Sequence, residues 1–296
     1  MGNILTKQFY RQRKDFEDSC AGRDAGLTFP EGVRCSTDIA YADDGIKAHL
    51  LDIYRPEDSQ EKVLPVIINV HGGGLIIGNK EFNRYFCALL CKKGFLVYSI
   101  GYRLVPDCLI YDQIADVFIA MDYIKERLAA DGGDSSHVYM AGDSGGACLI
   151  TYANAIQNNT NIARAANVTP SGLRINALGL ISGMFYTSRF DKIGLFLPKY
   201  LYGRDYKKTP FAKYVNPENR ELLNSLAPVW LVTSHNDFLR RYTTDFEKAL
   251  TRAEREHELV VFPKNKKLTH AFSVFEPFLP ESSAVIDMMV EYLRKF

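Results

Sequence analysis

The chain has 296 residues, of which 47% are hydrophobic and 24% are charged, proportions typical of a soluble globular protein. Its 36 basic and 35 acidic side chains give a formal net charge of +1, so no overall field attracts nucleic acid or an anionic membrane. No apolar run approaches the length of about 20 residues that a membrane-spanning helix requires. We therefore predict one domain over residues 1–296, with no nucleic-acid partner and no membrane span.

In the first segment, residues 1–35, charged and aromatic residues are interspersed, and this segment precedes the first clear strand pattern. Basic side chains at Lys7, Arg11, Arg13 and Lys14 leave residues 1–14 without the apolar core of a secretory signal. We expect an appended, cap-like helical segment and a cytoplasmic protein.

Two alternating segments, Ile39–Tyr41 and Ala48–Tyr54, follow on either side of the turn-forming Asp43-Asp44-Gly45. Alternation around such a turn predicts an antiparallel hairpin, which we place at the edge of a sheet.

From residue 64 onward, apolar strand-like runs alternate with helical patterns, which predicts an α/β fold with a mostly parallel central sheet flanked by helices. The expected strands are Leu64–Val70, Phe95–Ile100, Val138–Ala141, Ala177–Ile181, Pro228–Thr233 and Glu258–Phe262. The expected helices are Asn83–Lys92, Tyr111–Ala129, Ser144–Gln157, Tyr242–Glu256 and Glu281–Lys295.

A long aromatic-rich connection, from about residue 184 to 226, interrupts this alternation. Long connections in compact domains are usually functional, so we interpret this one as a cap insertion over an apolar pocket that includes Phe185 and Tyr186. The alternative is aromatic packing that only holds the loop against the protein.

The motif Gly142-Asp143-Ser144-Gly145-Gly146 lies where an apolar strand meets a helix. This context is typical of a nucleophile elbow, in which a strained backbone exposes the serine hydroxyl and the glycines allow strand and helix to approach. Ser144 is therefore the candidate nucleophile. Asp143 would either bind a neighbouring group of the site or be a solvated polar residue at the turn.

A second glycine motif, His71-Gly72-Gly73-Gly74, follows the strand that ends at Val70. Glycine lets backbone N–H groups approach a substrate oxyanion, so we expect the donors to be Gly73 and Gly74 together with Gly145 at the helix start. Which two of the three loop glycines point inward stays open from sequence alone. Leu75 is a candidate for the pocket wall, and His71 for shaping the loop.

Acyl transfer by serine also needs a base and a carboxylate at the carboxyl ends of the strands. Of the six histidines, only His235 and His270 follow a strand there, and His270 fits the order Ser, Asp, His. We expect His270 to be the general base, with His235 as the alternative. Asp237 follows the preceding strand and is the expected carboxylate, although spacing alone does not separate it from Asn236 or Asp245.

The six cysteines include no CxxC pair and no dense framework, which indicates reduced thiols without disulfides. Cys87 and Cys91 could share a helix face, but without nearby histidines core packing is the better interpretation, and we expect no metal site.

Five motifs together resemble the hormone-sensitive-lipase-like group of α/β-hydrolase esterases. They are the HGGG loop at 71–74 with Gly78, YRLVP at 102–106, GDSGG at 142–146, DFLR at 237–240 and HAF at 270–272, and the resemblance spans residues 37–296. It implies the α/β-hydrolase fold with a small cap, a Ser144, Asp237 and His270 triad, and hydrolysis of short-chain carboxylic esters without a cofactor.

The resemblance leaves the substrate open. Leu75, Arg241 and Ala271 stand where the group usually has an aromatic, an acidic residue and glycine. We expect a small ester as the bound partner. A carbohydrate acetyl esterase and a non-catalytic ligand-binding relative are the alternatives, and a homodimer is compatible with either.

Overall fold

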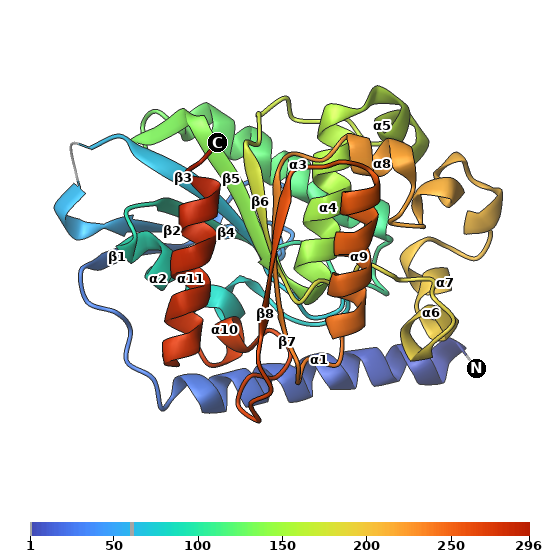
Figure 1. Ribbon diagram of the computed structural model, residues 1–296, viewed down its shortest axis with the longest axis horizontal. Coiled ribbons are helices and arrows are strands. Elements are labelled where there is room, and N and C mark those ends of the chain that lie inside the picture. The colour runs from blue at the N-terminus through green and yellow to red at the C-terminus, as the bar shows by residue number, and fades with distance from the viewer. Residues whose placement is uncertain (1, 60–61) are drawn as a thin grey trace.

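The computed structural model describes residues 2–59 and 62–296, and within this range one mixed sheet of eight strands forms the centre of the protein (Figure 1). The strand order is β1-β2-β4-β3-β5-β6-β7-β8. The strands are β1 (Val33–Ala40), β2 (Leu50–Pro56), β3 (Leu64–Val70), β4 (Leu96–Ile100), β5 (Gly133–Asp143), β6 (Ala177–Ile181), β7 (Val229–Ser234) and β8 (His257–Phe262). Strand β2 pairs antiparallel with β1 and β4, and every later pair is parallel, which confirms the predicted edge hairpin and mostly parallel sheet.

Helices cover both faces of this sheet. They are α1 (Gly2–Asp24), α2 (Arg84–Lys92), α3 (Ile110–Arg127), α4 (Ser144–Asn158), α5 (Thr160–Ala166), α6 (Lys192–Phe196), α7 (Pro198–Leu201), α8 (Arg220–Asn224), α9 (Arg240–Arg252), α10 (Phe272–Phe275) and α11 (Pro280–Leu293). The buried side chains of α3, α4 and α9 belong to one apolar cluster, and those of α2, α10 and α11 to another. Among the described residues no helix is both long and apolar enough to cross a bilayer.

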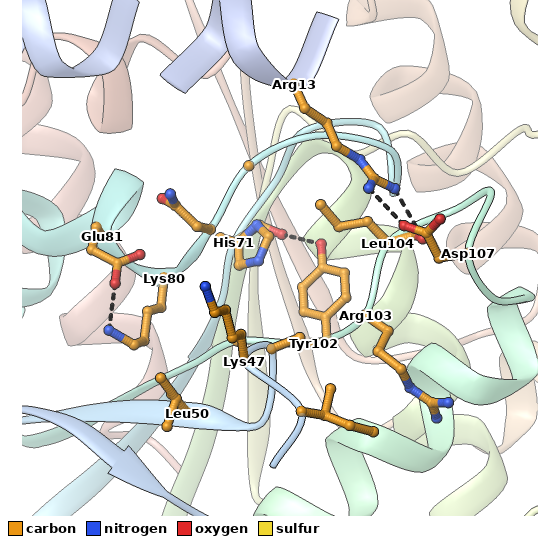
Figure 2. Close-up of a pocket in the computed structure, with 15 residues that line it drawn as sticks. Arg13, Lys47, Leu50, His71, Lys80, Glu81, Tyr102, Arg103, Leu104 and Asp107 are labelled. Atoms are coloured by element: carbon orange, nitrogen blue, oxygen red, sulfur yellow. Dashed lines mark hydrogen bonds and ion pairs between the residues drawn. The ribbon is translucent and has the colours of Figure 1, made fainter. Parts of the chain in front are cut away.

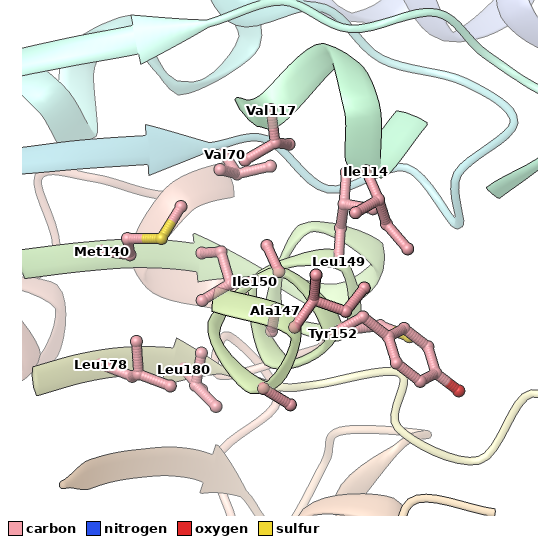
Figure 3. Packing of buried hydrophobic residues seen from close by; sticks show 14 of the residues in the cluster. Val70, Ile114, Val117, Met140, Ala147, Leu149, Ile150, Tyr152, Leu178 and Leu180 are labelled. Atoms are coloured by element: carbon pink, nitrogen blue, oxygen red, sulfur yellow. The ribbon is translucent and has the colours of Figure 1, made fainter. Parts of the chain in front are cut away.

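Helix α4 begins at the predicted nucleophile, Ser144, and is buried along most of its length. Ala147, Leu149 and Ile150 are almost completely shielded from solvent and pack among side chains of α3 and of the central strands (Figure 3). Because interiors are packed closely, this burial fixes the position of the first turn of α4 relative to the sheet.

The predicted strand and helix boundaries agree with the structure except at a few ends. Strand β5 begins at Gly133, well before the predicted Val138, because Gly133 pairs with Leu64 through the backbone although the intervening side chains are polar. Helix α9 ends at Arg252 and not at Glu256. Glu254 has a positive φ of 54°, and a left-handed residue is a common way to end a helix.

The cap-like N-terminal segment is a single long helix. Helix α1 crosses the molecule at the edge where β7 and β8 end, and its N-terminal end lies beside α6 and α7 of the long insertion (Figure 1). The ring of Phe9 on α1 contacts the ring of Tyr200 on α7 edge to face, with centroids 5.2 Å apart. The two segments that the sequence suggested as cap elements therefore touch each other.

Candidate active site

The turn from β5 into α4 has the strained geometry of a nucleophile elbow. Ser144 has a φ of 49°, in the left-handed region that a non-glycine residue seldom occupies. A methyl group on Gly146 would lie 2.1 Å from the carbonyl oxygen of Val70, and one on Gly142 would lie 2.6 Å from the same oxygen. Both glycines are needed here because the helix start lies directly against β3.

His270 and Asp237 lie next to Ser144, although they are distant from it in sequence. The Nε2 atom of His270 is 2.9 Å from the Ser144 Oγ, and its Nδ1 is 2.7 Å from the Asp237 Oδ1. Asp237 follows β7 and His270 follows β8, so the carboxyl ends of neighbouring parallel strands bring both side chains to the elbow.

The surroundings of Asp237 favour its ionised form. Burial raises the pKa of this carboxyl, but hydrogen bonding to His270 and its nearby charge, with further hydrogen bonds from the Leu239 N–H and the Thr233 hydroxyl, outweigh burial and lower the pKa below its usual value. An ionised Asp237 accepts a hydrogen bond from the Nδ1–H group of His270. The Nε2 lone pair then faces the Ser144 hydroxyl, as a general base requires.

The alternative residues lie elsewhere. His235 is within 2.9 Å of Arg240 Nη1 at an exposed position, and Asp245 forms an ion pair with Arg189 at 2.8 Å. Neither is bonded to Ser144 or His270. The geometry therefore separates Asp237 and His270 from the alternatives His235 and Asp245.

In the glycine loop, one backbone N–H group is bonded within the protein and two lie at the cavity. The Gly72 N–H donates to Asp143 Oδ1 at 3.0 Å. In the part of the chain that the structure describes, the N–H groups of Gly73 and Gly74 have no protein acceptor, and both glycines line the cavity at Ser144. A Cβ built on Gly145 would lie 2.9 Å from the Gly74 nitrogen, so the three glycines predicted as oxyanion donors lie together. Of the three loop glycines, Gly73 and Gly74 line the cavity, whereas the Gly72 N–H is bonded to Asp143.

Asp143 and His71 fix the base of the same loop. Asp143 is 1% exposed and also accepts from Asn83 Nδ2 at 2.9 Å, and burial raises the pKa of its carboxyl despite these hydrogen bonds. His71 stacks on Tyr102 with ring centroids 4.3 Å apart, and its Nδ1 lies 2.8 Å from the Gly72 oxygen. Burial lowers the pKa of His71 to about 4, so its imidazole is neutral. Asp143 is thus a buried partner of the loop and not a solvated turn residue.

A cavity of about 660 Å³ opens at Ser144. Its walls are mostly apolar and come from α1, the glycine loop, the insertion and the segments after β7 and β8. The lining side chains are Gln12, Asp15, Phe16, Ser19, Ile76, Ile77, Asp143, Ser144, Met184, Ile193, Leu197, Phe238, Leu239, His270 and Phe275, with Gly73 and Gly74.

Three of the four predicted pocket residues do not line this cavity. Leu75 is completely buried in the core, Phe185 stacks on Phe246 of α9 with centroids 4.1 Å apart, and Tyr186 donates to Glu218 at 2.8 Å. The three residues are close in sequence to residues that line the cavity, but their own side chains point elsewhere. A loop has no periodicity from which the direction of each side chain could be predicted. Asp143 does line it.

Most of the side chains that line the cavity were not predicted from the sequence. Phe16 had a usable signal, since it recurs at helical spacing from Phe9 on the inner side of α1. Met184 and Phe238 had none beyond their closeness to predicted strand ends.

No group of three His, Cys, Asp or Glu side chains in the described chain is placed to bind a metal ion. All six cysteines are free, and Cys87 and Cys91 are both buried in the core beneath α2, as their spacing suggested.

The sequence and the structure both match known proteins. A family model described as alpha/beta hydrolase fold matches residues 67–273. A probable isoprenylcysteine alpha-carbonyl methylesterase of Oryza sativa subsp. japonica is 29% identical over 184 residues, which cover 58% of this chain and 44% of that protein. Esterase LipC of Mycobacterium tuberculosis is 32% identical over 122 residues, covering 41% and 30%. The chain thus spans less than half the length of these curated relatives.

Solved structures match over nearly the whole chain. Esterase B from Lactobacillus rhamnosis superposes with a TM-score of 0.92 at 22% identity, covering 100% of this chain and 96% of that one. A bacterial heroin esterase superposes with a TM-score of 0.72 at 22% identity, covering 97% and 91%. At this level of identity the match establishes the shared fold.

Proposed function

Because the chain belongs to the alpha/beta hydrolase fold family, whose model matches residues 67–273, we propose that it is a serine-dependent carboxylic ester hydrolase. The observation that carries the proposal is the continuous hydrogen-bonded series from Asp237 through His270 to Ser144, at 2.7 and 2.9 Å. It lies beside two glycine N–H groups without a protein acceptor.

The first half of the reaction forms an acyl-enzyme. Ser144 Oγ attacks the ester carbonyl carbon while His270 Nε2 takes the hydroxyl proton, and Asp237 stabilises the imidazolium that results. The carbonyl oxygen becomes an oxyanion, for which the N–H groups of Gly73, Gly74 and Gly145 are the proposed donors. The intermediate collapses, the carbon–oxygen bond to the alcohol breaks, and His270 returns the proton to the leaving alkoxide.

The second half releases the acid. A water molecule gives a proton to His270 Nε2 as its oxygen attacks the acyl carbon, and the same N–H donors again face the oxyanion. Collapse of this intermediate breaks the bond to the Ser144 Oγ, which recovers its proton from His270. Each proton that His270 accepts is returned within the same half-reaction, so no cofactor is required.

The cavity favours uncharged, short-chain esters. Its walls are mainly aliphatic and aromatic, and no lysine or arginine is among the described residues that line it. Lys264, Lys266 and Lys267 of the loop before His270 are all exposed outside it. A volume of about 660 Å³ lies within the usual range for small-ligand sites. We propose that α1 and the insertion from about residue 184 to 226 act together as its cap.

The test is hydrolysis of p-nitrophenyl acetate, butyrate and octanoate by the wild-type protein and by Ser144→Ala. We expect turnover of the short esters, and a loss of at least about 10³-fold in kcat in the variant. Acetylated sugars in the same panel test the carbohydrate acetyl esterase alternative. A correctly folded wild-type protein that is inert on every ester would contradict the proposal and favour a ligand-binding relative.

We also propose a cytoplasmic location. All six cysteines are free in the structure, three of them completely or nearly completely buried, which suits a reducing compartment. Fractionation of the expressing cells would test it, and a protein recovered only outside the cytoplasm would contradict it.

A further inference from the structure

One side of α1 faces the body of the protein. The side chains of Phe9, Arg13, Phe16, Cys20 and Arg23 recur there at alternating spacings of four and three, and the first four are each less exposed than the residues beside them in sequence. Such a stripe is ordinarily apolar. Arg13 lies between Phe9 and Phe16 in this stripe, and its guanidinium is partly buried. A buried charged group needs hydrogen-bond acceptors.

Arg13 finds these acceptors in two loops, and Figure 2 shows its guanidinium beside Leu104 and Asp107 of the second loop. Its Nε donates to the Ile76 carbonyl oxygen at 2.7 Å. Its Nη2 donates to the carbonyl oxygens of Leu104 and Val105 at 3.0 and 2.7 Å. Its Nη1 forms an ion pair with Asp107 at 2.7 Å, and the arginine side chain is only 17% exposed. All these bonds are charge-assisted, and hence stronger than bonds between neutral groups.

The Ile76 carbonyl belongs to the loop that carries the proposed oxyanion donors. The N–H groups of Ile76 and Ile77 both donate to the Gly73 oxygen, which folds the loop into a tight turn immediately after the glycines. The Val105 N–H donates to the Leu75 oxygen at 3.0 Å, so the second loop that Arg13 holds is itself bonded to the first. A displacement of Ile76 would therefore move Gly73 and Gly74.

Other supports of this loop act on its beginning and middle. The Tyr102 hydroxyl donates to the His71 oxygen at 2.7 Å, and Asp143 accepts the Gly72 N–H. These groups come from the sheet and its connections. Arg13, in contrast, comes from α1, outside the segment 67–273 that the family model matches, and it holds the exit of the loop.

We propose that Arg13 is a positioning residue for the oxyanion hole: by holding the Ile76 carbonyl, it keeps the Gly73 and Gly74 N–H groups directed at the reacting carbonyl. This inference rests on the proposed ester hydrolase function. It makes the docking of α1 a condition for fast acyl transfer, because loss of the contact loosens the oxyanion donors while the hydrogen bonds of the triad remain in place.

Helix α1 has enough other contacts to stay in place without the Arg13 guanidinium. The Phe16 ring packs edge to face on Phe82, with centroids 4.8 Å apart. Arg23 donates to the carbonyl oxygens of Phe82 and Val274 at 3.0 and 3.3 Å. The variant Arg13→Met, which keeps an unbranched apolar stem, should therefore fold with α1 docked.

The first measurement compares Arg13→Met and Arg13→Lys with the wild type on p-nitrophenyl butyrate. We expect kcat to fall about 10- to 100-fold in Arg13→Met with KM changed less than about threefold, because an oxyanion interaction matters mainly in the transition state. Arg13→Lys should be intermediate, since one ammonium cannot reach all the carbonyls that the guanidinium holds. Lys14→Met is the matched control: the Lys14 side chain is 74% exposed and pairs with Asp18 on the same helix, so kcat should not change.

The second measurement separates an oxyanion effect from a general structural one. An alkyl boronic acid forms a negatively charged tetrahedral adduct with the serine, whereas an alkyl amide of the same length binds as a neutral ground-state analogue. Arg13→Met should weaken boronate inhibition by about the same factor as kcat and leave amide inhibition unchanged. Equal weakening of both inhibitors, or an unchanged kcat in the folded variant, would overturn the inference.

The same series distinguishes this inference from the function on which it rests. A wild type that hydrolyses no ester overturns both, whereas an active wild type with an equally active, folded Arg13→Met overturns only the role of Arg13. If circular dichroism shows that Arg13→Met is unfolded, Arg13→Lys decides by the same ratios. A reduced kcat with unchanged KM and weaker boronate binding supports the proposal, and wild-type values overturn it.

Discussion

The proposed catalytic corner and the proposed cap border the same cavity but are held in place by different interactions. In the corner, which comprises the β5–α4 elbow, the glycine loop and the strand ends that carry Asp237 and His270, Ser144 is 7% exposed and Asp143 1%. Backbone groups make many of the contacts there. In the cap, α1 and the insertion are held mainly by side chains, and Phe190 and Phe196 are 93% and 58% exposed.

Because of this difference, we expect the corner to determine mainly the reaction rate and the cap to determine mainly the choice of substrate. A displacement of the corner changes the alignment of the reacting atoms, to which rate is very sensitive. A change in the cap alters the walls that contact the substrate, and pocket contacts contribute more modestly to selectivity. Arg13 is an exception among the side chains of the cap, since its guanidinium bonds to a loop of the corner.

Asp237→Asn should give the largest change. An amide at this position donates a hydrogen bond where the carboxylate accepted one, so it favours the tautomer of His270 that cannot take the Ser144 proton. We expect kcat for p-nitrophenyl butyrate to fall by about 10³- to 10⁴-fold with little change in KM. Asp245→Asn, at the carboxylate that pairs with Arg189, is the control and should stay within about twofold of the wild type. Similar activity in both variants would remove Asp237 from the mechanism.

Two glycine substitutions compare the packing of the two regions directly. In the corner, the methyl group of Gly146→Ala would lie 2.1 Å from the Val70 oxygen and 2.5 Å from the His71 oxygen, both backbone atoms of a buried segment. We expect a loss of about 3 kcal/mol or more in the free energy of unfolding, measured by denaturant titration. In the cap, Gly22 of α1 has nothing within 4 Å of an added Cβ, so Gly22→Ala should raise stability by about 0.5 to 1 kcal/mol.

Equal effects at the two glycines would show that the corner is no more tightly packed than the cap. A folded, fully active Gly146→Ala would contradict the close approach of α4 to β3.

The corner should also respond to acid through His71. Burial lowers the pKa of His71 from an ordinary 6.5 to about 4, so the unfolded chain binds this proton at a higher pH than the native protein does. The contribution of the neutral His71 to the free energy of unfolding is fully present above pH 6.5 and is lost as the pH falls through 4. Between pH 7.5 and 4.5 the wild type should therefore lose about 2 to 3 kcal/mol more than His71→Asn, whose amide does not titrate.

Denaturant titrations of both proteins at the two pH values test this expectation. The comparison cancels the other titrating groups, because they are common to both proteins. If the two lose stability in parallel, then His71 is already solvated in the native protein.

The corner could be predicted from sequence because its chemistry requires particular residue types at particular strand ends. Ser144 and the glycine loop each follow a buried strand, and Asp237 and His270 follow the last two. The parallel sheet then brings these ends together, whatever the separation along the chain. In the structure His270 lies 2.7 Å from Asp237 and 2.9 Å from Ser144.

The cap could not be predicted to the same depth. Leu75, Phe185 and Tyr186 were expected in the pocket wall because of their position in the chain, yet contacts such as that between Phe185 and Phe246 turn them into the core. The orientation of a loop side chain depends on tertiary partners that local sequence does not specify. The role of Arg13 was hidden for the same reason, because its acceptors are backbone carbonyls of distant loops.

Phe16→Ala should give the smallest effect, a change of selectivity and not of rate. The Phe16 ring lines the cavity and packs against Phe82 and Phe275, so its removal should lengthen the space available to the acyl chain. We expect the ratio of kcat/KM for p-nitrophenyl octanoate to that for the acetate to rise about tenfold, with kcat for the acetate changed less than threefold. The leaving group is the same in both esters, so the ratio reports on the acyl side.

Phe9→Ala is the matched control for Phe16, because Phe9 lies on the same side of α1 but contacts Tyr200 and does not line the cavity. If loosening of the helix causes the change in selectivity, both variants should show it. If Phe16 acts as a wall, only Phe16→Ala should, and Phe9→Ala should keep the wild-type ratio. An unchanged ratio in both would place the acyl chain against another wall of the cavity, with Met184 and Leu197 as the next residues to substitute.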